Sequence, residues 1–327
     1  MSESGIKQER IYAAIEKVRA YLKTQQLPDG SWSFKPGLTE PSLEATAWVS
    51  LALQGESDLI EKVFSFYISA QNADGGFATA PDMGNSSWIT GPVVLSMRNL
   101  KDEIKQPLLS KEIEKSLDRA LTYMCDSRVE FYPAVARLLL LISKGPESLR
   151  YSRGWPWDKQ CFHWVEPTTY NLLALKTLGM PPAHKGYFQE ITDIAEKFIL
   201  EHSCKAGGWN HGNNITLGSD LPPYRVTTAE ALLAVQEYKN KKQVADALAY
   251  LESLSNEDTS SMALAWSSLA LNAYGKDNTK ENEFILQRQQ ENGSFGDNLM
   301  VDALACLALK SVNKNILKYQ EAAPSKT

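Results

Sequence analysis

The sequence lacks the features that would place it in a membrane, outside the cell or on a nucleic acid. Its apolar runs, such as Leu138 to Ile142, are far too short to span a bilayer. The first residues have no apolar core of the kind that a signal peptide needs. Lysine and arginine do not cluster, and the net charge of -5 gives no electrostatic footprint for nucleic acid. We therefore expect a cytoplasmic protein with no transmembrane segment and no nucleic-acid partner.

Cysteine is also scarce. Four cysteines, Cys125, Cys161, Cys204 and Cys306, are widely spaced in 327 residues. A chain of this length with 43% hydrophobic residues buries a sizeable core without disulfides, so we expect reduced, buried thiols. We expect one domain over residues 1–327, with frayed ends at 1–5 and 318–327.

No segment has a convincing strand pattern, whereas apolar residues recur at helical spacing along most of the chain. Some of the expected helices are amphipathic and charged, which predicts that one face of each is exposed to solvent. Others carry almost no charge, which predicts that they are buried on all sides, and we call these the dry helices. The two kinds alternate along the chain, as in two concentric rings with the dry helices inside. The expected helices are 6–26, 41–54, 56–71, 87–99, 109–126, 132–144, 167–179, 186–203, 226–239, 242–255, 259–274, 279–290 and 298–311.

Glycine-aromatic turns precede most of the dry helices. Gln26 to Trp32, Gln71 to Phe77 and Gln289 to Phe295 share glutamine, three residues, glycine, any residue, and an aromatic. Ser203 to Trp209 keeps this frame without the glutamine, and Gly154 to Trp157 is a looser relative. Glycine supplies the left-handed conformation that ends a helix, and the aromatic ring packs on the next helix. The glutamine amide forms hydrogen bonds to backbone groups left without a partner at the helix end. The turns are therefore expected to be structural staples between repeats.

The dry segments also resemble one another, as in Glu44 to Leu53, Glu166 to Leu175 and Val226 to Val235. Their turns and Leu-Ala-Leu helices resemble the repeats of squalene-hopene cyclases, class II terpene cyclases and protein prenyltransferase β-subunits, over most of residues 10 to 311. The resemblance implies an all-α fold, an (α/α)6 toroid of alternating inner and outer helices around an apolar cavity that accepts an isoprenoid. Seven segments are of the inner type, so one of them, Phe131 to Ser143, should be misassigned or an extra helix.

The resemblance also indicates where an acid would stand. Class II cyclases protonate an alkene or epoxide with the central aspartate of an Asp-x-Asp-Asp-Thr-Ala motif, which this sequence lacks. Alignment on the Leu-Ala-Leu frame places Glu44 and Glu166 at that aspartate, followed two residues later by Thr46 and Thr168. The register stays open, because Glu40 could pair with Glu166 instead. We therefore take Glu44 and Glu166 as the candidate catalytic acids.

A structural explanation competes with this one. Neither glutamate has the second acidic neighbour of the motif, and Glu or Pro in a first turn suits any helix N-terminus. Asp302 and Glu230, on other inner helices, are weaker candidates of the same kind. The side chains expected to line the cavity are Trp48, Trp88, Trp164, Tyr170, Tyr224, Trp266 and Asp302.

Metal and phosphate chemistry has little support. The sequence has no Asp-Asp-x-x-Asp cluster and no Gly-rich loop ahead of a helix, and Asp302 and Cys306 miss the Asp-x-Cys spacing of a prenyltransferase zinc site. The remaining thiol and imidazole groups that could approach one another as a zinc site are Cys161, His163, His202, Cys204 and His211. We expect no cofactor, with zinc as the minority alternative.

Three functions stay open. The first is an enzyme that cyclises or isomerises an isoprenoid chain by acid-initiated carbocation chemistry. The second is a protein that binds an isoprenoid or another apolar ligand without catalysis, and the third is a zinc-dependent, protein prenyltransferase-like enzyme. Full-length cyclases often have two toroids and this chain has room for one, which favours a partner subunit or a simpler reaction.

Overall fold

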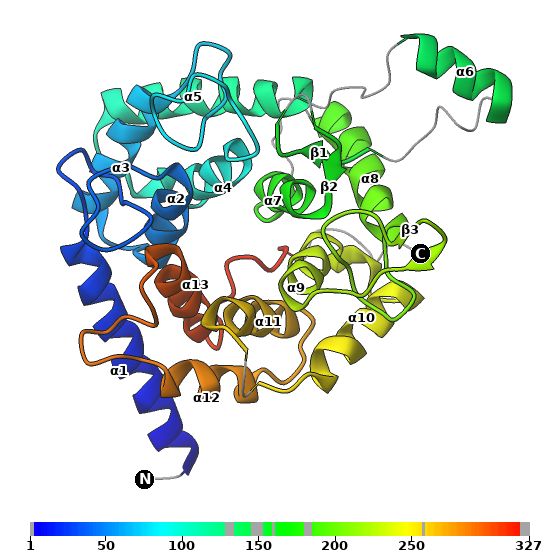
Figure 1. Cartoon of the computed structure of the whole chain (residues 1–327). Coiled ribbons are helices and arrows are strands. Elements are labelled where there is room, and N and C mark those ends of the chain that lie inside the picture. Colours follow the sequence, from blue (N-terminus) through cyan, green and yellow to red (C-terminus); the bar gives the residue numbers. More distant parts are fainter. Residues whose placement is uncertain are drawn as a thin grey trace.

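Two concentric rings of helices form an α/α toroid, as the resemblance implied (Figure 1). The computed structural model describes residues 3–127, 134–144, 153–158, 161–179, 185–256 and 259–320. Within that part of the chain every helix expected from the sequence is present, with ends that differ by one to three residues in most cases.

The inner ring consists of the dry helices. They pack side by side in chain order, and the last contacts the first, so the ring is closed. Their residues are almost all buried, which explains why their sequences have no wet face. The inner helices are α2 (Leu43–Ala52), α4 (Thr90–Leu100), α7 (Val165–Lys176), α9 (Arg225–Ala234), α11 (Ser261–Ala273) and α13 (Leu299–Lys310).

The outer ring consists of the amphipathic helices, each of which buries one face against the inner ring. These are α1 (Glu3–Thr24), α3 (Ser57–Ala70), α5 (Pro107–Asp126), α8 (Lys185–Glu201), α10 (Lys242–Ser253) and α12 (Thr279–Gln287). The seventh inner-type segment forms α6 (Ala134–Lys144), which projects outside both rings (Figure 1). The extra segment that the repeat count predicted is therefore this helix.

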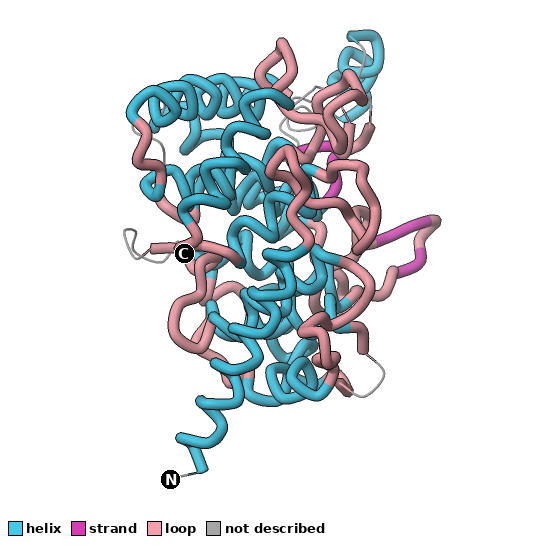
Figure 2. Tube along the Cα trace, turned by 90° about the vertical axis from the view of Figure 1, so that its left-hand side faces the viewer, coloured by secondary structure: helices cyan, strands magenta, loops and turns pink. Residues whose placement is uncertain are grey.

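Two short hairpins are present where the sequence predicted no strand. Strand β1 (Trp155–Pro156) pairs with β2 (His163–Trp164), and β3 (Ile215–Thr216) pairs with β4 (Ser219–Asp220), all antiparallel. Ladders of two residues are too short to produce an alternating pattern, which is why no strand signal is visible in the sequence. The hairpins lie with the loops that lead into the inner helices, on one face of the toroid (Figure 2). We call this face the mouth, and the opposite one the far face.

The glutamine turns join neighbouring repeats. In each of the three turns the glutamine Nε2 donates to the carbonyl of its own glycine and to a carbonyl of the next outer helix around the ring. The pairs of acceptors are Gly30 and Leu59 for Gln26, Gly75 and Ser116 for Gln71, and Gly293 and Ala14 for Gln289. The last turn bonds to the first helix, so the same contact closes the outer ring.

The aromatic residue of each turn sets the position of the inner helix that follows. The backbone N–H of the aromatic donates to a threonine hydroxyl near the start of that helix, at 2.8 to 3.0 Å, in the pairs Trp32–Thr46, Phe77–Thr90, Trp155–Thr168 and Trp209–Thr228. Because these threonines are equivalent, Glu44 occupies the same position as Glu166, and the alternative pairing through Glu40 is wrong.

The end of the chain packs against the far face. The Tyr319 hydroxyl donates to the Ala234 carbonyl at 2.9 Å, and helix α1 starts at Glu3. Fraying at 1–5 and 318–327 stays a prediction. Residues 1–2 and 321–327 lie outside the described residues.

The turn glycines allow the close approach on which these bonds depend. Gly293 has φ of 99°, and a Cβ there would lie 2.6 Å from the Lys17 carbonyl oxygen of α1. Gly37 also has a positive φ, 78°, but nothing lies within 4 Å of its Cβ position. The two glycines therefore share the left-handed strain and differ in the steric clash.

We expect Gly293→Ala to reduce the free energy of unfolding by about 2 kcal/mol more than Gly37→Ala, because only the first substitution forces the turn away from α1. Urea denaturation of both variants and the parent measures the difference. Equal losses in the two variants would show that the contact with α1 is not needed for closure of the ring.

Candidate active site at the barrel mouth

Three aromatic rings meet on the barrel axis. Trp48 of α2, Tyr170 of α7 and Trp266 of α11 have ring centroids 5.2 to 6.2 Å apart, which is contact distance for aromatic side chains. Both tryptophans are fully buried and Tyr170 is 4% exposed. We call these residues the aromatic trio. The trio therefore fills part of the interior where the resemblance implied an apolar cavity.

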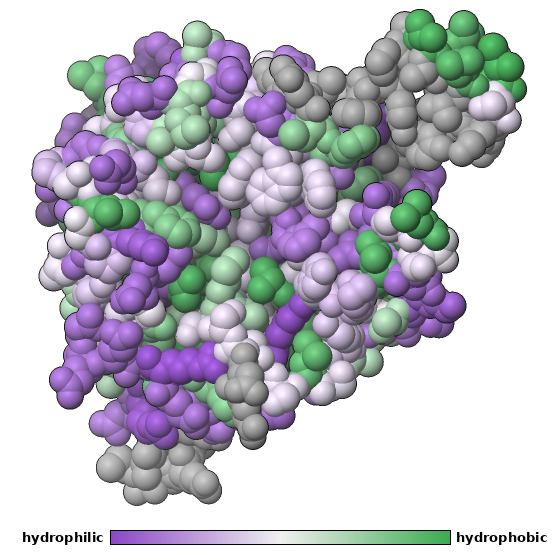
Figure 3. Space-filling model, viewed as in Figure 1, coloured by the Kyte–Doolittle hydropathy of each residue, from purple (hydrophilic) through white to green (hydrophobic). Residues whose placement is uncertain are grey.

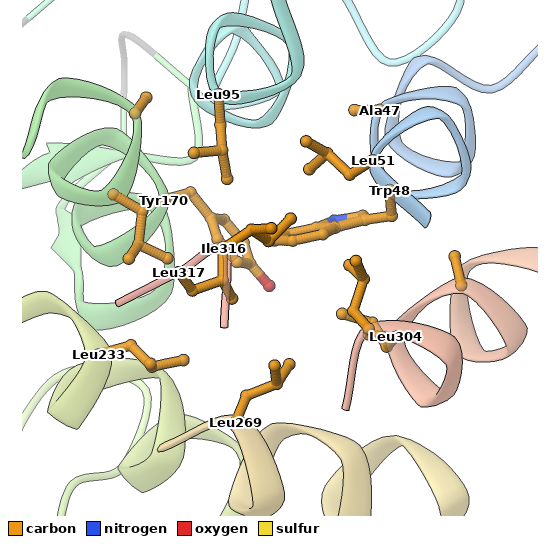
Figure 4. Close-up of a cluster of buried hydrophobic side chains, with 14 of the residues drawn as sticks. Ala47, Trp48, Leu51, Leu95, Tyr170, Leu233, Leu269, Leu304, Ile316 and Leu317 are labelled. Carbon is orange, nitrogen blue, oxygen red and sulfur yellow. The ribbon is translucent and has the colours of Figure 1, made fainter. Parts of the chain in front are cut away.

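The trio divides the interior into two parts. Leu51 and Leu269 lie one helical turn beyond Trp48 and Trp266, and they cluster on the axis with Leu95, Leu233, Leu304, Ile316 and Leu317 (Figure 4). On the mouth side, Trp88 stacks on Tyr170 with centroids 5.5 Å apart and meets Trp157 edge-on at 4.7 Å. The mouth side is therefore aromatic and the far side aliphatic.

Two other aromatics from the expected lining stand further out. Tyr224 is 48% exposed and its ring lies 5.1 Å from that of His211. Trp164 lies beside Gly212, where a Cβ would be 3.2 Å from the indole. The structure thus brings Trp48, Trp88, Tyr170 and Trp266 together and leaves Trp164 and Tyr224 at the edge. Trp157 was missed, although its glycine-aromatic turn had been noticed.

A buried carboxyl group lies beside the trio. Glu230, in the second turn of α9, accepts a hydrogen bond from the Tyr170 hydroxyl on Oε1 at 2.7 Å, and its Oε2 is buried without a partner. Burial raises the pKa of Glu230 well above its ordinary value, the charge of Glu166 raises it further, and the bond from Tyr170 lowers it. Burial and the neighbouring charge therefore favour the neutral, protonated form of Glu230.

Glu44 is the second acid of the site. It lies in the first turn of α2, which stands opposite α9 across the inner ring. Burial raises the pKa of Glu44 to about 7, so near neutrality this group gains and loses a proton readily. A carboxyl with this pKa is well matched to general acid–base chemistry.

Glu166 has partners instead. Its Oε1 lies 2.6 Å from His211 Nδ1 and accepts a hydrogen bond from the Thr227 hydroxyl at 3.2 Å. The Glu166 side chain is 12% exposed and that of His211 is 53% exposed, so the pair connects the site to solvent. Burial is the first cause of the raised pKa of Tyr170, and the charges of Glu230, Glu44 and Glu166 raise it further, so all three carboxyl groups act on this hydroxyl.

The sequence ranked these acids differently. Glu44 and Glu166 were the leading candidates, and they do stand at the mouth. Glu230 was a weaker candidate because it lies one turn deeper, outside the aligned position of the other two. Its signal was present nevertheless, since it is the only charged residue between Val226 and Val235, and a charge inside a dry helix marks a buried polar site.

Asp302 does not line the cavity, and that expectation was wrong. Its carboxylate accepts hydrogen bonds from the backbone N–H of Phe295 and from the Ser294 hydroxyl. This is the role that Thr46 has in the first repeat. In the sixth repeat, Asp302 is therefore the acceptor of the hydrogen bond that joins the turn to its inner helix. We call this bond the staple. The Asp302 side chain points to the turn.

The thiol and imidazole groups do not assemble a zinc site. His202 Nδ1 bonds to the Phe198 carbonyl, His211 pairs with Glu166, and no group of three His, Cys, Asp or Glu suited to a metal occurs among the described residues. Within the described residues no cysteine forms a disulfide, and Cys161 is exposed and Cys125 half-buried, which corrects the expectation that every thiol is buried.

Exposed apolar side chains gather around the mouth. Large ones lie in the loops that lead into the inner helices, at Phe34, Leu38, Met83, Phe162, Ile215 and Leu217, and others lie on α6. Figure 3 looks onto this face, where apolar patches alternate with polar ones and the largest green patch covers α6. No described helix has the length and apolar character needed to cross a bilayer.

Comparison with known proteins supports the fold. No family model and no curated protein sequence matches the chain. Among solved structures, the type II terpene cyclase MstE from Scytonema, bound to the product merosterolic acid A, is similar with a TM-score of 0.59 and 12% identity over 94% of this chain and 98% of that one. A glycosidase is similar with a TM-score of 0.63 and 11% identity over 95% and 98%. At these identities the likeness shows the shared α/α toroid.

The raised pKa of Glu44 predicts pH-dependent stability. Between its ordinary value of 4.5 and about 7 the folded chain binds more protons at this site than the unfolded chain, so stability falls as pH rises through that interval. Glutamine cannot ionise. We therefore expect Glu44→Gln to gain roughly 1 to 3 kcal/mol relative to the parent between pH 4.5 and pH 8, measured by urea denaturation. Glu40→Gln, at an exposed position, is the control, and parallel profiles for the two variants would contradict the prediction.

The staple role of Asp302 predicts which substitutions it tolerates. Thr keeps an acceptor, as in four other repeats, whereas the similarly shaped Val leaves the Phe295 N–H unpaired. We expect Asp302→Val to lose about 2 kcal/mol more unfolding free energy than Asp302→Thr. Thermal and urea denaturation of the two variants measure this difference in unfolding free energy. Equal stability would mean that the bond from the Phe295 N–H is not needed for the fold.

Proposed function

We propose that this chain is an enzyme that starts a cyclisation or isomerisation of an isoprenoid by protonating a double bond or an epoxide. The observation that carries the proposal is Glu230, a buried and protonated carboxyl whose Oε2 has no partner and which lies beside three aromatic rings. A proton donor to carbon must keep its proton free of other acceptors in a dry site, and Glu230 meets that requirement.

The hydrogen bond from Tyr170 places the acidic proton. Because the Tyr170 hydroxyl donates to Oε1, the proton of Glu230 belongs on Oε2. In the proposed step the Oε2–H bond breaks, the proton adds to one alkene carbon or to the epoxide oxygen, and a carbocation forms. Glu230 becomes a carboxylate that Tyr170 stabilises. Loss of a proton from the final cation to a base balances the reaction, so the net change is an isomerisation.

The aromatic side chains suit a cationic intermediate. Trp48, Trp266 and Trp88 all contact the ring of Tyr170, whose hydroxyl bonds to Glu230, and aromatic faces attract a cation electrostatically. The indole N–H groups of both trio tryptophans are also buried without partners. Buried polar groups without partners are rare in folded proteins and are costly, which favours a ligand-binding role for this layer.

The other two carboxyl groups have supporting roles. Glu44, with a pKa of about 7, is the second candidate donor and an acceptor for the final proton. Glu166 and the half-exposed His211 form the route by which a proton from solvent reaches the acids. Glu44 and Glu166 thus keep a place in the chemistry, with Glu230 as the leading donor.

The surroundings favour an apolar substrate. Apolar side chains around the mouth offer contacts to a hydrocarbon and few to a sugar. The similar structure of MstE is also described in complex with its substrate, geranylgeranyl dihydroxybenzoate. A glycosidase is the second candidate, because a neutral Glu230 and a partnered Glu166 differ in environment as the acid and base of such an enzyme do.

The test is product formation by the purified chain. Farnesyl and geranylgeranyl diphosphate, squalene, oxidosqualene and geranylgeranyl dihydroxybenzoate are supplied separately, and organic extracts are analysed by mass spectrometry. We expect Glu230→Gln to lower the rate at least 100-fold, roughly the usual contribution of a general acid. Glu40→Gln serves as the control, with an unchanged rate.

The outcomes separate the alternatives. Loss of product in Glu44→Gln with full activity in Glu230→Gln would move the donor to Glu44. Its activity should then fall as pH rises through about 7, whereas a Glu230 donor stays protonated there. Hydrolysis of aryl glycosides without any isoprenoid product would favour the glycosidase, and binding without turnover would leave a non-catalytic binding protein.

A further inference from the structure

The chain end fills the barrel from the far face. After α13 ends at Lys310, the chain passes beneath the inner ring and inserts Ile316 and Leu317 among the aliphatic side chains on the axis (Figure 4). Leu317 is fully buried and Ile316 is 8% exposed. This segment belongs to no helix and to no repeat.

The side chains that Figure 4 draws around these two residues are hydrophobic. Four inner helices direct a leucine toward the axis one turn beyond the trio, at Leu51, Leu95, Leu233 and Leu269, and Leu304 of α13 lies beside them at the height of the trio (Figure 4). None of these side chains reaches across the ring to close it, as the rings of the trio do one layer above. We call this layer the leucine chamber. Without residues 316 and 317 it would be an apolar cavity open to the far face.

A few polar contacts hold the segment in place. Gln236 does most of this, since its Nε2 donates to the Leu317 carbonyl at 2.7 Å and its Oε1 accepts from the Tyr319 N–H at 3.0 Å. Asn315 Nδ2 donates to the Leu269 carbonyl at 2.9 Å, and the Tyr319 hydroxyl bonds to Ala234. These groups lie at the end of the barrel, where water can replace each partner if the segment leaves.

We infer that residues 315–319 are a displaceable plug and that the leucine chamber binds the hydrocarbon chain of a ligand in their place. Ile316 and Leu317 offer branched aliphatic groups to the leucines, which is the surface that an isoprenoid chain presents. Release of the plug moves only the chain after α13 and leaves every staple intact. The inference deepens the proposed function by naming where the substrate's chain lies, and it rests on that function for the ligand class.

Binding of a fluorescent chain tests the inference independently of turnover. The probe is cis-parinaric acid, a linear polyene whose fluorescence rises in apolar surroundings, with farnesol as competitor. A variant that ends at Lys314 lacks the plug, and a matched variant that ends at Gln320 keeps it. We expect the first to bind one probe per chain at least tenfold more tightly than the second, and farnesol to displace the probe.

Two further variants keep the test decisive. Leu269→Trp in the chain ending at Lys314 should fill the chamber and abolish the tight binding. If that shortened chain does not fold, as judged by circular dichroism, Ile316→Ala/Leu317→Ala in the full chain should still strengthen binding several-fold. Equal affinity with and without the plug, or binding that Leu269→Trp does not change, would overturn the inference. Because only binding is measured, a failed proton-transfer mechanism would leave this result unaffected.

Discussion

The structure depends on one repeated hydrogen bond, from the backbone N–H of a turn aromatic to a side-chain oxygen of the next inner helix. Threonine is the acceptor in four repeats and Asp302 in the sixth. The bond fixes the height of each inner helix relative to its turn. Glu44, Trp88 and Glu166, which stand two residues before their acceptors, therefore reach the mouth at equivalent positions. The same constraint that closes the toroid thus assembles the site.

Three glutamates with different environments act on the Tyr170 hydroxyl. Burial raises the pKa of Glu230 well above its ordinary value and that of Glu44 to about 7, whereas Glu166 is hydrogen-bonded to His211. A site that separates the protonation states of neighbouring acids has a donor and an acceptor ready at one pH. This difference in environment, and not the number of acids, is what makes the mouth a candidate for acid catalysis.

Much of the fold could be predicted from the sequence, because helical periodicity and the glycine turns are local signals. The dry helices, the outer helices and the surplus α6 follow from them. The site was harder, since it depends on which residues meet across the ring. Asp302 resembled a buried acid but replaces a staple threonine, and Glu230 looked secondary because its partner Tyr170 is 60 residues away. The insertion of Ile316 and Leu317 has no periodic signal, because the contact is made by two residues outside any repeat.

Similar toroids include a terpene cyclase and glycosidases, so the architecture does not determine the chemistry. What distinguishes this chain is how its interior is layered. The aromatic trio separates a mouth with acidic and aromatic groups from a chamber that is purely aliphatic. The leucine chamber does not favour binding of a sugar, because the hydroxyl groups of a sugar would lose their hydrogen bonds to water there without gaining new ones. A molecule with a polar or unsaturated end and a long hydrocarbon tail fits both layers. Its reactive end would contact the acidic side chains, and its tail would pack against the leucines. A ligand that spans both layers requires the side chains of Trp48, Tyr170 and Trp266 to move apart, because they are packed against one another in this structure.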